Sequence, residues 1–244
     1  MIDLVSFRNT YLQVPWLFPL VIGDRQFDAV LNGRPRSARD KAQRGLERAM
    51  WFWPRAVDAT VWAAGASDKP QTPLNYTTLD ELARLLLNWV EQVCPDREAT
   101  ILDLGCNCGR HIIHLAGRGY RNLVGVDAMR AAIALFAERA PIVFQNGEIH
   151  HDLFQRFLSR QPDRRFALTY SHGSTIELVH PSFDIVAHMS RVTRRHICLI
   201  LNEREAFRRD WLRQFGRHGF NLLHGERPVA LDSAASLIVL QRAP

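Results

Sequence analysis

Four residues close together in the sequence could bind a ligand that carries a cationic group and hydroxyls. Asp103 and Gly105 follow an apolar run, and Gly109 comes four residues later. Glycines at such a turn permit positive φ and let a ligand approach the backbone closely. A carboxylate two residues before the first glycine suits a cationic amino group and would repel a pyrophosphate. Asp127, at the end of the next apolar run, is placed to accept hydrogen bonds from ribose hydroxyls.

The glycine spacing argues against a nicotinamide dinucleotide as the ligand. The dinucleotide fingerprint is G-x-G-x-x-G, whereas Gly105 and Gly109 are four residues apart. An NAD-dependent oxidoreductase is therefore the last of the functions that we consider.

The elements around this turn alternate between short apolar runs and amphipathic segments. This alternation predicts parallel strands joined by crossover helices, which makes a doubly wound α/β sheet. Two final runs read as an antiparallel pair, so we expect a seven-stranded mixed sheet with a terminal antiparallel hairpin. The predicted strands are 99–104, 122–126, 142–145, 166–170, 196–201, 221–226 and 236–241, and the helices between them are 110–117, 130–140, 152–160, 181–190 and 205–218.

A further helix is predicted within residues 75–95, with Thr77 or Thr78 as its N-cap and an apolar stripe along one face. It leads directly into the first strand. We therefore divide the chain into a mostly helical N-terminal cap, residues 1–74, which would select the substrate, and a cofactor-binding domain, residues 75–244.

Two stretches resemble a known family. Ile101-Leu-Asp-Leu-Gly-Cys-Asn-Cys-Gly-Arg110 and Leu123-Val-Gly-Val-Asp-Ala128 are similar to the first two motifs of class I, Rossmann-like methyltransferases that depend on S-adenosylmethionine (SAM). The first is more narrowly similar to bacterial members with D-x-G-C-N-x-G-R, several of which accompany glycan or other specialised biosynthesis. The resemblance covers roughly residues 75–244. It implies a Rossmann-like fold, SAM as cofactor and S-adenosylhomocysteine as product.

The resemblance also implies roles for residues. The first loop and its acidic residue would hold the methionine end, the acidic tip of the second strand the ribose, the next two residues the adenine ring, and a glutamate after the third strand the adenine amino group. Many members have glycine at position 107, where asparagine tolerates the left-handed conformation. The cofactor-binding candidates are Asp103, Gly105, Cys106, Asn107, Gly109, Asp127, Ala128, Met129, Gly147, Glu148 and Tyr170.

The segment after the fourth strand would border the methyl-transfer pocket. Family members often carry an L-E-H-x-x-x-P-like segment there, of which this chain keeps Glu177 and lacks the adjacent histidine. His172 and His180 are the catalytic candidates, as bases for a hydroxyl acceptor, or else they orient substrate or pack at the pocket rim. Glu177 is a substrate candidate that could instead brace the loop, and Tyr76 is a candidate lid residue over the substrate.

The net charge of the chain suggests a nucleic-acid partner, but the distribution of the charged residues does not support one. The net charge is +6, but only Lys41 and Lys69 among the 31 basic residues are lysines, and the arginines are spread out. A nucleic-acid partner is therefore not expected. The exception is segment 34–55, which is rich in arginine and tryptophan. This segment could be a lid that grips an acidic or sugar-like acceptor, a membrane-surface helix, or a solvated face with packed tryptophans.

The cysteines do not form a disulfide framework or a recognisable metal site. The chain has four, of which Cys106 and Cys108 form a C-x-C pair with His111 and His114 nearby. We expect small loop residues there and no metal. No apolar run is long enough for a transmembrane segment and no signal peptide is recognisable, so we expect a cytoplasmic protein. An oligomer is compatible with the sequence.

The leading hypothesis is a SAM-dependent methyltransferase that acts on a small molecule or glycan intermediate, at oxygen. Methylation of RNA or protein is the second hypothesis, and neither an RNA-binding module nor an N-P-P-Y-like motif supports it. A non-catalytic SAM-binding or scaffold protein is the third.

Overall fold

Seven strands form one mixed sheet in the computed structural model, which describes residues 73–173, 175–179, 183–202, 210–228, 230–232 and 235–244. Their order across the sheet is β3-β2-β1-β4-β5-β7-β6. The first five are parallel, and β7 runs antiparallel to both of its neighbours. The predicted α/β fold with its terminal hairpin is confirmed. The strands are β1 (Ile101–Leu104), β2 (Leu123–Asp127), β3 (Glu148–His151), β4 (Phe166–His172), β5 (Thr193–Asn202), β6 (Phe220–Glu226) and β7 (Ala235–Arg242).

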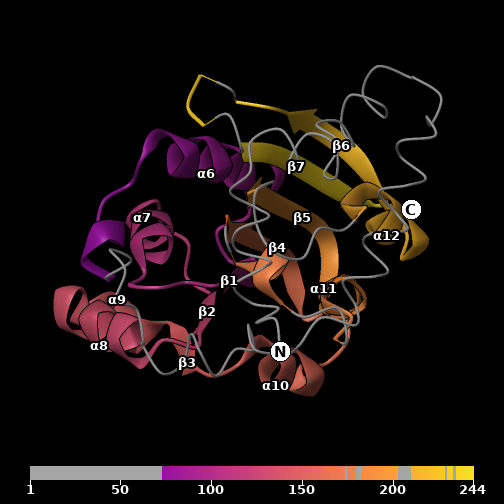
Figure 1. Ribbon diagram of the computed structural model, residues 1–244. Coiled ribbons are helices and arrows are strands. Elements are labelled where there is room, and N and C mark those ends of the chain that lie inside the picture. Colours follow the sequence, from indigo (N-terminus) through magenta and orange to yellow (C-terminus); the bar gives the residue numbers. More distant parts are fainter. Residues whose placement is uncertain (1–72, 174, 180–182, 203–209, 229, 233–234) are drawn as a thin grey trace, which may run out of the picture.

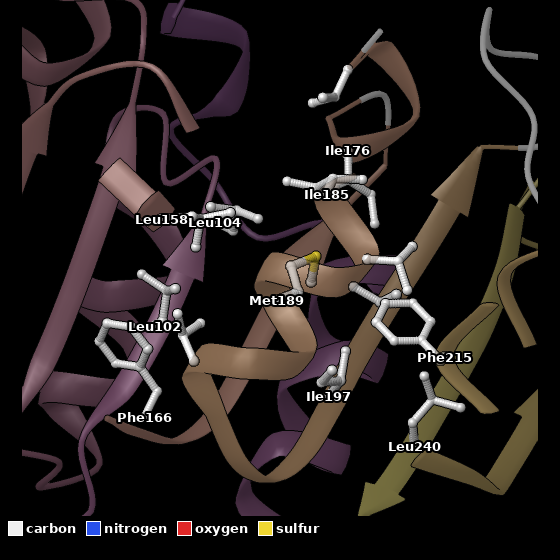
Figure 2. Close-up of a cluster of buried hydrophobic side chains, with 14 of the residues drawn as sticks. Leu102, Leu104, Leu158, Phe166, Ile176, Ile185, Met189, Ile197, Phe215 and Leu240 are labelled. Carbon is white, nitrogen blue, oxygen red and sulfur yellow. The ribbon is translucent and has the colours of Figure 1, made fainter. Parts of the chain in front are cut away.

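Helices cover both faces of this sheet (Figure 1). One face packs against α6 (Glu81–Val93), α7 (Arg110–Gly117) and α8 (Arg130–Arg139). The other packs against α10 (Phe154–Arg160), α11 (Ile185–Val192) and α12 (Trp211–Arg217). Figure 2 shows the second cluster, in which Met189 of α11 lies among side chains of the sheet.

Strand alternation in β1 decides which residues reach each layer. Leu102 and Leu104 belong to the cluster under α10–α12, while Ile101 belongs to the one under α6–α8. Asp103 shares the side of Ile101, and its side chain is 1% exposed. The strand thus carries one carboxylate into an apolar layer.

The third strand lies later in the sequence than we predicted. Residues 142–145 are helical, as part of α9 (Pro141–Asn146), and the strand is β3. Pro141 occupies the first helical turn, where its fixed φ suits a helix and its missing N–H is not needed. β3 is an edge strand with the polar sequence Glu-Ile-His-His and no fully buried residue. The apolar run 142–145 therefore gave a false strand signal, and the true strand gave almost none.

The N-cap of α6 is Asp80 rather than Thr77 or Thr78. Its Oδ1 accepts a hydrogen bond from the backbone N–H of Ala83 at 2.7 Å. The threonines precede the helix, next to a 3₁₀ turn, η2 (Pro73–Tyr76). The helix consequently begins at Glu81, later than the predicted segment.

Several predictions fall outside the described residues. These are the N-terminal cap through residue 72, the basic segment 34–55, His180, and parts of the predicted helices 181–190 and 205–218. Within the described ranges, no helix is both long and apolar enough to cross a bilayer.

Candidate active site

A cavity of about 300 Å³ opens where the parallel strands end. Ligands bind in open α/β sheets at this edge, beyond the carboxyl ends of the strands. The tips of four strands line it, through Gly105 after β1, Asp127 of β2, His172 of β4 and Asn202 of β5. The cavity therefore has two sides, a β1–β3 side and a β4–β5 side.

The loop after β1 is shaped by three residues with positive φ. Gly105, Asn107 and Gly109 have φ of 94°, 47° and 77°. A side chain on Gly105 would collide with Thr175, and a Cβ on Gly109 would lie 2.5 Å from the Phe136 ring. These positions need glycine for both conformation and space. The resulting turn brings the backbone of residues 105–107 to the cavity wall.

Asp127 ties the β2 tip to this loop. Its Oδ2 accepts the N–H of Asn107 at 2.9 Å, and its Oδ1 accepts the N–H of Met129 at 2.8 Å. Burial raises the pKa of the Asp127 carboxyl, and these two hydrogen bonds oppose that rise. Each carboxylate oxygen has a second lone pair, so both can still accept hydrogen bonds from ligand hydroxyls.

Asp103 lies behind the loop and does not line the cavity. Its carboxylate oxygens make no hydrogen bond of normal geometry with the described residues, and Nδ1 of His111 is 3.6 Å from Oδ2. Burial first, and then the Asp103 carboxylate, raise the pKa of the Tyr170 hydroxyl well above its ordinary value. Tyr170 is itself fully buried. Tyr170 and Cys106 of the loop belong to the same buried cluster.

The β4–β5 side is built from side chains that come from distant parts of the sequence. Arg110, the first residue of α7, places Nη2 3.1 Å from Nδ1 of His172 and Nη1 2.9 Å from Oδ2 of Asp80. Its guanidinium lies over the Tyr76 ring, 5.7 Å from the ring centroid. His111 follows in the helix, with Nε2 3.3 Å from Nδ1 of His172. All five residues line the cavity.

Glu177 braces the wall rather than lining it. It sits in a 3₁₀ turn, η3 (Ile176–Leu178), with 2% of its surface exposed. Its two oxygens accept the N–H groups of Thr175 at 3.0 Å and Asn202 at 2.5 Å. This carboxylate therefore joins the loop after β4 to the tip of β5.

Both thiols of the loop are buried. Burial raises the pKa of Cys106 well above its ordinary value, and the Asp127 carboxylate adds to the rise. Burial also raises the pKa of Cys108, whose Sγ lies 3.1 Å from the carbonyl oxygen of Tyr76. Within the described part of the chain, no three His, Cys, Asp or Glu residues are grouped to hold a metal.

Most predicted cofactor residues meet at this cavity, and a minority do not. Glu148 begins β3 and pairs in register with Val124, whereas Asp127 pairs with His151 at the other end of the strand. Glu148 therefore lies at the far end of β3, where it contacts His150 and Arg165. Gly147 caps α9 near it. The predicted residues that line the cavity are Gly105, Cys106, Asn107, Asp127, Ala128, Met129, His172 and Tyr76, and those that do not are Asp103, Gly109, Gly147, Glu148, Tyr170 and Glu177.

Sequence reasoning missed several residues of the cavity wall. Phe154 and Gln155 line the cavity and begin α10, which follows β3 in the sequence. They were missed because the third strand was predicted too early in the sequence. Asn202 directly follows the apolar run 196–201, and the rule that ligands meet strand ends would have found it. Asp80 was missed because the predicted N-cap was Thr77 or Thr78, and its place beside Arg110 depends on tertiary structure.

Comparison with known families identifies the central part of the chain. Residues 101–196 match a family model described as a methyltransferase domain. The matched region runs from β1 into β5 and includes the glycine loop, Asp127 and His172. The chain carries a methyltransferase domain. Comparison of its sequence with curated proteins finds no match.

Solved structures of methyltransferases share the fold of this domain. A geranyl diphosphate methyltransferase in complex with SAM is 15% identical, with a TM-score of 0.54 over 66% of this chain and 84% of the other. Magnesium protoporphyrin IX methyltransferase from Synechocystis, also with SAM, is 13% identical, with a TM-score of 0.55 over 79% and 94%. The [4+2]-cyclase SpnF is 12% identical, with a TM-score of 0.54 over 80% and 95%.

SAM, which both of these methyltransferases bind, fits the β1–β3 side of the cavity. The paired oxygens of Asp127 suit the ribose hydroxyls, and Ala128 and Met129 line the wall beside them, where the adenine ring would lie. Residues 105–107 line the wall where the methionine end would lie.

Proposed function

We propose that this enzyme transfers a methyl group from SAM to an oxygen of a small molecule or glycan intermediate. The observation that carries the proposal is the shared cavity, which joins the glycine loop and Asp127 to His172 without a break. A small acceptor in the β4–β5 half would meet the methyl group there. The likeness of the first loop to D-x-G-C-N-x-G-R members that accompany glycan biosynthesis also supports it.

The chain's residues have a limited task in this reaction. When bound, SAM supplies an activated methyl group, so the protein contributes alignment and exclusion of water. Asp127 would fix the cofactor's ribose, and the loop backbone would fix its amino-acid end. His172 would orient the acceptor oxygen at the other side of the methyl group, because it lines the same cavity.

The names of the structural relatives support a small acceptor but do not identify which one. Two of them are named for geranyl diphosphate and magnesium protoporphyrin IX, both small molecules. The third is a cyclase, which illustrates that one scaffold serves several reactions. The proposal therefore depends on the cavity rather than on any one relative.

Calorimetric titration of the full chain with SAM, S-adenosylhomocysteine and NAD tests the proposal. We expect dissociation constants on the order of 1–100 µM for the first two and no binding of NAD. Asp127→Asn should weaken SAM binding about tenfold, because a charge-assisted hydrogen bond is lost. Asp163→Asn is the matched control, since this exposed carboxylate pairs with Arg191 rather than facing the cavity.

The outcomes separate the leading function from its alternatives. SAM binding that Asp127→Asn does not alter would remove the assigned ribose site. Failure of the wild-type chain to bind SAM would overturn the proposed function. With binding established, transfer of a labelled methyl group to candidate hydroxyl compounds identifies the acceptor.

A further inference from the structure

His172 receives a hydrogen bond whose direction is fixed by chemistry. Its Nδ1 lies 3.1 Å from Nη2 of Arg110. A guanidinium has only donors, so Nδ1 must present its lone pair to Arg110. The roles at the second contact, to Nε2 of His111, depend on the tautomer of His111. Arg110 alone therefore requires that the proton of a neutral His172 be on Nε2.

Arg110 is held in place by partners of its own. Its Nη1 donates to Oδ2 of Asp80 at 2.9 Å and to the carbonyl oxygen of Thr78 at 3.0 Å. Only 10% of its side chain is exposed. Asp80 is fixed in turn as the N-cap of α6. The guanidinium is therefore anchored beside the imidazole, rather than being a mobile surface group.

His172 stays neutral where it faces the cavity. Burial first, and then the nearby His111 and Arg110, lower its pKa to about 3, against an opposing effect of Asp80. These groups, with Asp103 behind His111, are the charged and titratable residues around the ring. Nε2 makes no hydrogen bond with any described residue, while the side chain lines the cavity. An N–H is thus available to a ligand.

We propose that Arg110 is a positioning residue that holds His172 in the Nε2–H form, and that His172 donates a hydrogen bond to the acceptor oxygen. This inference rests on the proposed function. A neutral imidazole with its proton on Nε2 cannot take a proton at that nitrogen. His172 therefore orients the acceptor and does not act as its base.

The inference narrows the class of acceptor. With His172 as a donor, the site suits an acceptor oxygen that loses its proton to solvent, as a phenol, an enol or a carboxylic acid does. The ionised oxygen then forms the new C–O bond while the C–S bond of the sulfonium breaks. The electron pair of that bond returns to sulfur, so the charges of oxygen and sulfonium cancel. His172 contributes a donor that aligns the oxygen lone pair.

Nitrogen NMR of the histidine rings in the full chain tests the tautomer. Long-range ¹H–¹⁵N spectra of ¹⁵N-histidine-labelled protein, with His172→Gln to assign the signal, should show Nε2–H at neutral pH. Arg110→Gln should lose this preference, and the apparent pKa of His172 should rise towards the ordinary value of about 6.5. A proton on Nδ1 in the wild type overturns the inference, whether or not Arg110→Gln folds.

A matched arginine provides the control. Nη1 of Arg139 donates to the carbonyl oxygen of Thr77 at 3.2 Å, so it tethers the same segment that Arg110 tethers at Thr78. Arg139 does not line the cavity. Arg139→Gln should therefore leave the His172 tautomer unchanged. The same tautomer shift in both variants would overturn the specific role of Arg110.

Phenol, added with S-adenosylhomocysteine, probes the donor role. It should shift the Nε2 resonance of His172 in the wild type, and an unchanged resonance at the solubility limit of phenol overturns the acceptor class. Calorimetry with SAM on the same samples separates this inference from the proposed function. If SAM binds and the proton is on Nδ1, the inference fails alone. If SAM does not bind, the proposed function itself fails.

Discussion

The two sides of the cavity are built by different means. On the β1–β3 side, backbone conformation shapes the cavity wall, through the positive φ of Gly105, Asn107 and Gly109. On the β4–β5 side, side chains shape the wall, through the hydrogen bonds of Arg110, His172 and Glu177. The first side uses residues within one βαβ unit. The second uses contacts between residues up to 62 positions apart.

This difference suits what each side must do. A cofactor that many enzymes share can be held by backbone groups and one carboxylate, which tolerate change in the surrounding side chains. An acceptor that differs between enzymes requires side chains that can be exchanged without altering the sheet. We therefore expect substitutions in the backbone-built side to cost more folding stability than substitutions in the side-chain-built side.

Gly109→Ala should have the largest effect on stability, because it disturbs the backbone conformation of the loop on the β1–β3 side. A Cβ there would lie 2.5 Å from the Phe136 ring, at a φ of 77°. Left-handed strain and overpacking together should lower the free energy of unfolding by about 3 kcal/mol. Chemical denaturation measures this loss.

Gly119→Ala is the control that separates strain from collision. Gly119 has a φ of 88°, but a Cβ there would meet nothing within 4 Å. This variant should lose only about 1 kcal/mol. Equal losses in the two variants would show that the contact with Phe136 does not constrain the loop.

Glu177→Ala should have an intermediate effect, confined to the β4–β5 side. It leaves the N–H groups of Thr175 and Asn202 without this acceptor, which should lower stability by about 2 kcal/mol. Hydrogen exchange at these two amides should accelerate, and SAM affinity should fall less than in Asp127→Asn. Glu177→Gln keeps one acceptor oxygen and should lose less stability than alanine. Unchanged exchange at both amides in Glu177→Ala would contradict the bracing role.

The same division explains what the sequence could predict. The fold class and the glycine loop can be predicted from local patterns, namely apolar runs of strand length and glycines close to Asp103. Asp127 was found for the same reason, because it directly ends a buried strand. A residue whose role depends on its immediate neighbours in the chain is accessible to such reasoning.

The parts that could not be predicted depend on tertiary structure. Residues 142–145 have strand-forming side chains, yet Pro141 begins a helix there and the polar β3 takes the edge of the sheet. Because the third strand was predicted at 142–145, Glu148 was expected to follow it and to bind the adenine amino group. Glu148 instead begins β3, at the end of the strand away from Asp127. Arg110 and His172 are 62 positions apart, and no spacing rule relates them.

Asp80→Ala should have the smallest effect, and it tests the link between α6 and the β4–β5 side. Loss of the N-cap bond to Ala83 should lower stability by about 1 kcal/mol. Asp80→Asn can still cap the helix but removes the charge beside Arg110, so its stability should stay within about 0.5 kcal/mol of the wild type. Thermal unfolding of the two variants measures the difference. If asparagine costs as much as alanine, the ion pair rather than the cap anchors this helix, and the β4–β5 side depends on charge more than the comparison of the two sides implies.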